Sequence, residues 1–130
     1  LSDIVNGVDC QTNVLIKYSN GAIASVSSAI NVQKPATGYI YGTKGYIFVD
    51  NINNYEAFHI YNQQHELLET IERPQQITGF EYQVQACIDA IRAGKIEPDA
   101  MPHSEILRVM EIMDSLRKEW GVTFPDEMNF

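Results

Sequence analysis

Two amphipathic segments in the last third of the chain constrain its fold most strongly. In residues 80–93, apolar side chains recur with the spacing of one helix face, and Gly94 follows as a stop signal. The second segment, residues 103–120, has Pro102 immediately before it and Gly121 after it. We therefore predict one helix from Phe80 to Ala93 and another from about His103 to Trp120.

The residues before these helices show the alternation and the turn signals of β-strands. Asn20-Gly21 predicts a tight hairpin, because both residues of such a turn need positive φ. Residues 42–45, Gly-Thr-Lys-Gly, predict a second tight turn. The predicted strands are Val8 to Tyr18, Ala22 to Ile30, Gly38 to Tyr41, Tyr46 to Val49, Ala57 to Tyr61 and Leu67 to Ile71.

This order of elements predicts an α+β fold. Strands joined by short turns pair mainly antiparallel, and helices that follow them cover one face of the sheet. We expect a two-layer domain, in which an open, mostly antiparallel β-sheet carries the two C-terminal helices packed on one face. The length of 130 residues suits a single domain, residues 1–130. The other sheet face would then need a partner, and a second copy or another domain would serve.

The charge balance argues against two classes of partner. Nine Lys and Arg residues are scattered among seventeen Asp and Glu residues, and the net charge is −8. Nucleic acid and anionic membrane both require clustered basic residues, so we expect neither as a partner. The two cysteines, Cys10 and Cys87, are interpreted as buried free thiols, which favours a cytoplasmic location.

We find no catalytic set, no cofactor-binding loop and no metal site in the sequence. His59 lies in a predicted strand and His65 at a predicted hairpin tip, and we interpret both as surface or edge residues rather than metal ligands. The Gly42–Gly45 segment joins two strands, whereas a phosphate-binding loop joins a strand to a helix. His103 begins a helix, where it caps or packs locally or faces a ligand.

Tyrosines cluster on two neighbouring predicted strands, at Tyr39, Tyr41 and Tyr46. Two interpretations stay open: they pack in a core or an interface, or they line a substrate cavity. Tyr39, Tyr41 and His103 are the candidates for a substrate-facing wall.

Four segments carry a resemblance to a known family: VDCQTNVLIKYSNGAIASVSS, YIYGTKGYIFV, GFEYQVQACIDAIRAGK and MPHSEILRVMEIMDSLRKEWGVTFP. Their residues and their order along the chain resemble the C-terminal domain of Gfo/Idh/MocA-type oxidoreductases, which include glucose–fructose oxidoreductase and inositol dehydrogenase. The dihydrodiol dehydrogenase-like branch is the most similar. The resemblance covers about Val8 to Glu127.

The resemblance implies hydride transfer between NAD or NADP and a sugar, a polyol or a related hydroxyl compound in the full-length parent. In that family an N-terminal Rossmann domain binds the dinucleotide, and a Lys in an E-K-P motif assists proton transfer. Neither the E-K-P motif nor a G-x-G-x-x-G fingerprint occurs in this sequence, so no catalytic or cofactor-binding residue can be carried over.

The leading hypothesis is therefore a C-terminal domain whose Rossmann domain is absent from this chain. Alone, it should bind no cofactor and be inactive. It would supply part of the substrate cavity and a homo-oligomer interface through its sheet face. The alternative is a stand-alone, non-catalytic binding or scaffold module that associates through its open sheet face.

Overall fold

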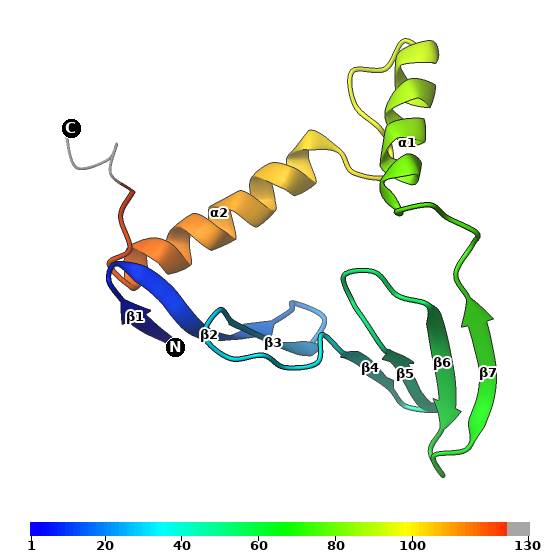
Figure 1. Cartoon of the computed structure of the whole chain (residues 1–130), viewed down its shortest axis with the longest axis horizontal. Coiled ribbons are helices and arrows are strands. Elements are labelled where there is room, and N and C mark those ends of the chain that lie inside the picture. Colours follow the sequence, from blue (N-terminus) through cyan, green and yellow to red (C-terminus); the bar gives the residue numbers. More distant parts are fainter. Residues whose placement is uncertain (125–130) are drawn as a thin grey trace. The chain divides into compact units, whose positions relative to one another are not determined.

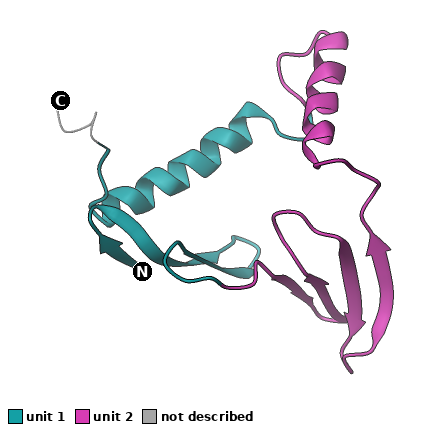
Figure 2. Ribbon diagram, in the orientation of Figure 1, with its two compact units in different colours: residues 1–33, 99–130 teal, residues 34–98 magenta. Residues whose placement is uncertain are grey.

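A computed structural model describes residues 1–124 of the chain (Figure 1). The end of the family-like segment, Pro125 to Glu127, lies outside the described residues. The chain divides into two compact units (Figure 2). The first unit comprises Leu1–Gln33 and Asp99–Phe130, and the second comprises Lys34–Pro98.

The first unit contains an antiparallel three-stranded sheet and one helix. Strands β1 (Ser2–Val5), β2 (Val8–Lys17) and β3 (Ile23–Ala29) are adjacent in that order, and helix α2 spans His103–Glu119. Thr12 is the buried polar residue of β2. Its hydroxyl lies 2.9 Å from the Ser2 hydroxyl and donates to the Asp9 carboxylate at 3.2 Å, so a polar contact joins β1 to β2.

The two hairpin turns of this sheet differ from each other. At Asn6-Gly7 both residues have positive φ, 53° and 78°, as a two-residue turn of the primed type requires. The predicted hairpin at Asn20-Gly21 is confirmed, but Asn20 has no positive φ. Tyr18 N donates to Ala22 O and Gly21 N donates to Tyr18 O, which closes a three-residue loop. The expectation of positive φ at both residues was therefore wrong, because only Gly21 takes this conformation.

The second unit contains a four-stranded antiparallel meander and one helix. Strands β4 (Gly38–Gly42), β5 (Gly45–Val49), β6 (Ala57–Asn62) and β7 (Leu67–Glu72) pair in chain order, and helix α1 spans Phe80–Arg92. The predicted strands in this region are confirmed to within one residue at each end. The small core of this unit includes Val49, Ala57 and Ala90.

Both helices end at the predicted glycines. After α1, Gly94 has φ 68°, Gly94 N donates to Ile91 O and Lys95 N donates to Ala90 O. After α2, Gly121 has φ 72°, with the equivalent bonds from Gly121 N to Lys118 O and from Val122 N to Arg117 O. Each pair of bonds is a Schellman motif, which satisfies the last carbonyls of the helix.

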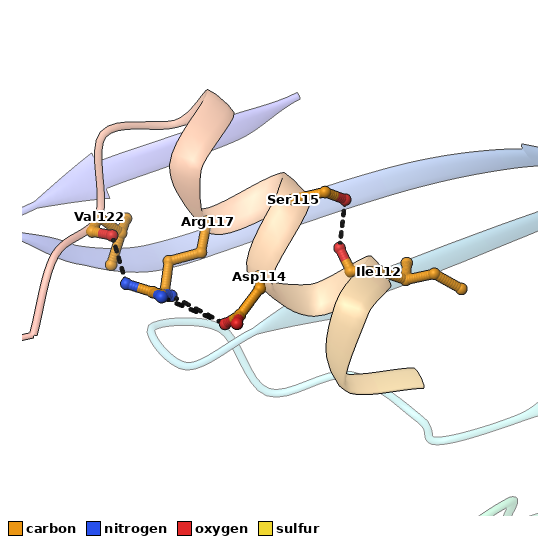
Figure 3. A network of polar contacts seen from close by, with 5 residues as sticks. All are labelled: Ile112, Asp114, Ser115, Arg117 and Val122. Atoms are coloured by element: carbon orange, nitrogen blue, oxygen red, sulfur yellow. Dashed lines mark hydrogen bonds and ion pairs between the residues drawn. The ribbon is translucent and has the colours of Figure 1, made fainter. Parts of the chain in front are cut away.

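Arg117 fixes the end of α2 through several contacts (Figure 3). Its guanidinium donates to Asp114 Oδ1 at 3.2 and 3.3 Å and to Val122 O at 3.2 Å, and it lies 4.5 Å from the centre of the Phe124 ring. The side chain is only 13% exposed. An arginine on an otherwise apolar helix face is thus satisfied locally.

The α+β class with open antiparallel sheets is confirmed. The structure adds that the strands form two sheets and that each unit holds one helix. The prediction of a single domain stays a prediction.

The expected burial of Cys87 was wrong. Cys10 is partly exposed and Cys87 is exposed, and both are free thiols. The apolar face of α1 that carries Cys87 has little covering it, with Phe80 72% and Ile91 74% exposed. The described helices include none with the length and apolarity needed to cross a membrane.

Candidate functional site

One face of the four-stranded sheet carries a cluster of aromatic side chains in mutual contact, and we take it as the candidate site. Strand alternation and the pairing register between β4, β5 and β6 bring six ring-bearing side chains together on this face. Tyr39 pairs with Phe48 and Tyr41 with Tyr46, while the next strand brings His59 beside Phe48 and Tyr61 beside Tyr46. We call this set the aromatic face: Tyr39, Tyr41, Tyr46, Phe48, His59 and Tyr61.

The rings of the aromatic face are in mutual contact. Tyr39 and Tyr41 stack with ring centres 5.7 Å apart and planes 6° from parallel. Tyr46 and Tyr61 stack at 4.9 Å with planes 13° apart, and Phe48 lies over His59 at 5.9 Å. Aromatic pairs in this range contribute about 0.5–1.5 kcal/mol each beyond their buried area. The rings therefore form a continuous layer, of which Tyr39 (51%) and Tyr41 (75%) are the most exposed.

The hairpin tip between β6 and β7 extends this layer with His65. Its Nδ1 lies 3.3 Å from the Tyr46 hydroxyl, and its ring centre lies 5.7 Å from that of Tyr46. The Asn62 side chain holds the tip, since its Oδ1 accepts from the backbone N–H groups of Gln64 and Glu66. His65 has φ 62°, a conformation that this tight tip imposes.

The hydroxyl of Tyr46 stays protonated at neutral pH. Desolvation among the neighbouring rings raises its pKa above the ordinary value, and repulsion from the phenolate forms of Tyr61, Tyr39 and Tyr41 raises it further. A protonated tyrosine hydroxyl can donate and accept hydrogen bonds. The aromatic face thus has the chemistry of a contact surface with polar tips.

The opposite face of the same sheet is mainly aliphatic, with one aromatic residue, Phe58. Ile40, Ile47 and Ile60 lie side by side on it, as do Val49, Phe58 and Ile71. A shallow depression of about 420 Å³ near the β4–β5 turn is lined by residues from both faces, including Ile40, Ile60 and Leu68 and also Tyr41, Tyr46 and Tyr61. Both faces of the sheet therefore present apolar surface, but only the aromatic face combines it with hydroxyl and imidazole groups.

The structure brings together two of the three residues predicted for the substrate wall. Tyr39 and Tyr41 are direct neighbours, and the expected cluster with Tyr46 is confirmed. His103 belongs to the other unit, as the first residue of α2. Pro102 is the N-cap residue there, and no side chain provides a capping hydrogen bond. The substrate-facing roles of all three residues stay predictions.

Sequence reasoning did not find Phe48, His59, Tyr61 and His65 as members of the same surface. The signal was present in the alternation of residues 39 and 41, 46 and 48, and 59 and 61. The sequence did not reveal the pairing register, which places these residues of the three strands on the same face of the sheet. His59 Nδ1 lies 3.3 Å from the Thr70 hydroxyl on β7. Separately, the described residues include no group of three His, Cys, Asp or Glu that could hold a metal ion.

These features define the class as an α+β domain with an exposed aromatic sheet face. Comparison with curated proteins shows which enzymes it is similar to. Trans-1,2-dihydrobenzene-1,2-diol dehydrogenase from Mus musculus is 27% identical over 131 residues, and the Homo sapiens protein of that name is 27% identical over 126 residues. Each match covers 93% of this chain and 38% of the relative.

A third relative is named for a different activity. The scyllo-inositol 2-dehydrogenase (NADP(+)) IolU of Bacillus subtilis (strain 168) is 26% identical over 120 residues, covering 92% of this chain and 36% of the relative. These proteins are Gfo/Idh/MocA family members, and the matching part is their C-terminal part, so the resemblance read from the sequence is confirmed. The chain spans little more than a third of the length of these relatives. No family model matches the sequence.

Proposed function

We propose that this chain is the C-terminal domain of an NAD(P)-dependent oxidoreductase that acts on a sugar, a polyol or a related hydroxyl compound. The observation that carries the proposal is similarity over 92–93% of the chain to dehydrogenases named for two types of substrate. The substrates in both names are ring compounds with vicinal hydroxyl groups. In the proposed enzyme, an N-terminal Rossmann domain binds the dinucleotide and this chain contributes to the substrate cavity.

The stacked rings Tyr39 and Tyr41 are the proposed contribution to the cavity wall. They are parallel and exposed, and their hydroxyl groups can bond substrate hydroxyls while the rings stack on C–H groups. NAD or NADP would enter through the other domain. The proposed location is the cytoplasm, and the proposed partners are the Rossmann domain and a second copy of the protein.

Steady-state kinetics of the full-length protein test the wall. Tyr39→Ala and Tyr41→Ala should each raise KM for the hydroxyl substrate by about two- to tenfold, the equivalent of one lost aromatic contact. Tyr18→Ala, in the β2–β3 hairpin, is the matched control and should leave KM unchanged. Unchanged KM in both wall variants would contradict the cavity role.

Calorimetry of the chain alone tests the division of labour. We expect no heat of binding with NAD or NADP, because the proposal places the dinucleotide site in the other domain. Micromolar affinity of the isolated chain for either dinucleotide would overturn the proposal. An E-K-P motif and a glycine-rich fingerprint encoded directly upstream would support it.

A second candidate function is a stand-alone scaffold that associates through a sheet face. The exposure of Tyr41 (75%) and Ile40 (64%) on opposite faces of β4 favours it. Sedimentation of Tyr41→Glu and Ile40→Glu would identify the face, since a buried unpaired carboxylate disrupts only the face that associates. A chain that stays monomeric at high concentration before any substitution would contradict association.

A further inference from the structure

The sequence contains two Asn-Gly pairs, and the structure places them in different chemical settings. Asn6-Gly7 joins β1 to β2, and Asn20-Gly21 lies in the loop between β2 and β3. Asn-Gly is the dipeptide most prone to spontaneous deamidation, because glycine has no side chain to hinder attack by its backbone nitrogen. The reaction joins the glycine nitrogen to Cγ of the asparagine, so both groups must be free to meet.

Hydrogen bonds hold both reacting groups of the second pair. Gly21 N donates to Tyr18 O at 3.0 Å, which directs the nitrogen into the loop. The Asn20 side chain accepts from Ala22 N at 3.0 Å through Oδ1. Attack on Asn20 Cγ therefore requires that both bonds open together.

The first pair has neither restraint. Within residues 1–124, no hydrogen bond involves the Asn6 side chain or the Gly7 N–H, and both residues are exposed. The turn must open briefly to bring Gly7 N to Asn6 Cγ. Strand β1 favours such opening, because it has only four residues, lies at the sheet edge and has an irregular register between Asp3 and Ile4.

We propose that Asn6 is a spontaneous deamidation site of this protein and that Asn20 is protected by its loop. Gly7 N gives up its proton and forms a bond to Asn6 Cγ, and the side-chain nitrogen leaves as ammonia with that proton. Water then opens the cyclic imide at one of its two carbonyls. The nitrogen regains a proton, and the product is aspartate or isoaspartate, with no change of oxidation state.

The product would loosen β1 from the sheet. Isoaspartate inserts an additional methylene into the backbone, so the two-residue turn that pairs Val5 with Val8 cannot keep its geometry. Either product adds one negative charge to a chain of net charge −8, on a hairpin that already carries Asp3 and Asp9. The contact between the Ser2 and Thr12 hydroxyls would be lost with the strand.

Peptide mapping by mass spectrometry after incubation at neutral or mildly alkaline pH tests the proposal. In the folded chain, we expect Asn6 to deamidate at least roughly tenfold faster than Asn20, since two hydrogen bonds must open first at Asn20. In urea the two rates should converge, because the local sequences are then equally free. Asn6→Gly removes the side-chain amide but keeps a residue that adopts positive φ, so it should abolish the fast deamidation at this position.

Three outcomes would overturn the proposal. An Asn20 rate equal to or above that of Asn6 in the folded chain would show that the loop gives no protection. A difference that persists in urea would assign it to sequence rather than structure. No reaction at Asn6 in the folded chain, with reaction in urea, would show that the β1–β2 turn itself protects.

Discussion

At the scale of a single residue, Gly45 shows how closely the strands of the second unit approach. A Cβ placed on Gly45, which has φ 155°, would lie 1.9 Å from the Tyr61 carbonyl oxygen. The same atom on Gly42, its cross-strand neighbour, would meet only the Gly45 oxygen at 3.7 Å, an ordinary contact. Only one of the two glycines in this turn is therefore required by packing.

We predict that Gly45→Ala destabilises the fold by about 1–3 kcal/mol, the range for an overpacked site. The matched variant Gly42→Ala should stay within about 0.5 kcal/mol of the parent, as surface substitutions usually do. Urea unfolding followed by circular dichroism measures both. Equal stability of the two variants would show that the β5–β6 spacing relaxes without cost.

Glu81 is the residue with the largest electrostatic role at a helix start. Its carboxylate accepts hydrogen bonds from Thr78 N at 3.2 Å, Gly79 N at 2.8 Å and the Thr78 hydroxyl at 3.1 Å. Hydrogen bonds from its own backbone N–H and from those of Ile77 and Thr78 lower its pKa from 4.5 to about 2. Gly79 at the N-cap has no side chain and α1 has no side-chain capping hydrogen bond, so Glu81 instead ties the residues just before the helix to its first turn.

The sign of the pH effect follows from this lowered pKa. A carboxyl group with a folded-state pKa below its unfolded value stabilises the fold above about pH 4.5, and the stabilisation is lost as pH falls toward about 2. Glu81→Gln should remove this acid-dependent contribution to α1, whereas Glu111→Gln on α2 should not. Helix content followed by circular dichroism from neutral to acidic pH tests it, and identical acid profiles would contradict this role of Glu81 at the start of α1.

At the scale of elements, the β1–β2 hairpin depends on the residue types of its turn. Asn6 takes φ 53°, which alanine adopts only at a cost of about 1–2 kcal/mol, while glycine adopts it freely. We predict that Asn6→Ala lowers stability by about 1 kcal/mol and that Asn6→Gly is nearly neutral. Thermal unfolding measures both; an alanine variant as stable as the glycine variant would mean that β1 contributes little to stability.

Most elements could be predicted from the sequence, and the exceptions have local causes. Strand β1 was missed because four residues give too short an alternation to recognise. The Asn-Gly signal was assigned to residues 20 and 21, but the turn with positive φ at both positions is at Asn6-Gly7. Helix ends were predicted well, because Gly94 and Gly121 act through their own backbone conformation.

At the scale of the whole molecule, the two units offer separate spectroscopic probes. The only tryptophan, Trp120, belongs to the first unit, and every tyrosine except Tyr18 belongs to the second. If the chain is one domain, Trp120 fluorescence and tyrosine near-ultraviolet circular dichroism should show coincident urea transitions. Separate midpoints would show that the units unfold independently and would contradict the single-domain prediction.

The candidate site was predictable in part. Tyr39, Tyr41 and Tyr46 were grouped correctly, because adjacent strands joined by a tight turn must place alternate residues on one face. Phe48, His59, Tyr61 and His65 joined them only through the register of β6 and the shape of its tip. Register depends on interactions between strands, and no single strand encodes it.

The sequence alone determined the element types, the helix ends and the family resemblance, because these depend on local periodicity, on the backbone freedom of glycine and on the residues of short sequence motifs. Tertiary structure decided the division into two sheets, the exposure of Cys87 and the composition of the aromatic face. The physical reason is the separation along the chain of the residues that interact. A helix cap or a turn involves residues a few positions apart, whereas strand partners and covered faces are selected by contacts between segments that are distant along the chain.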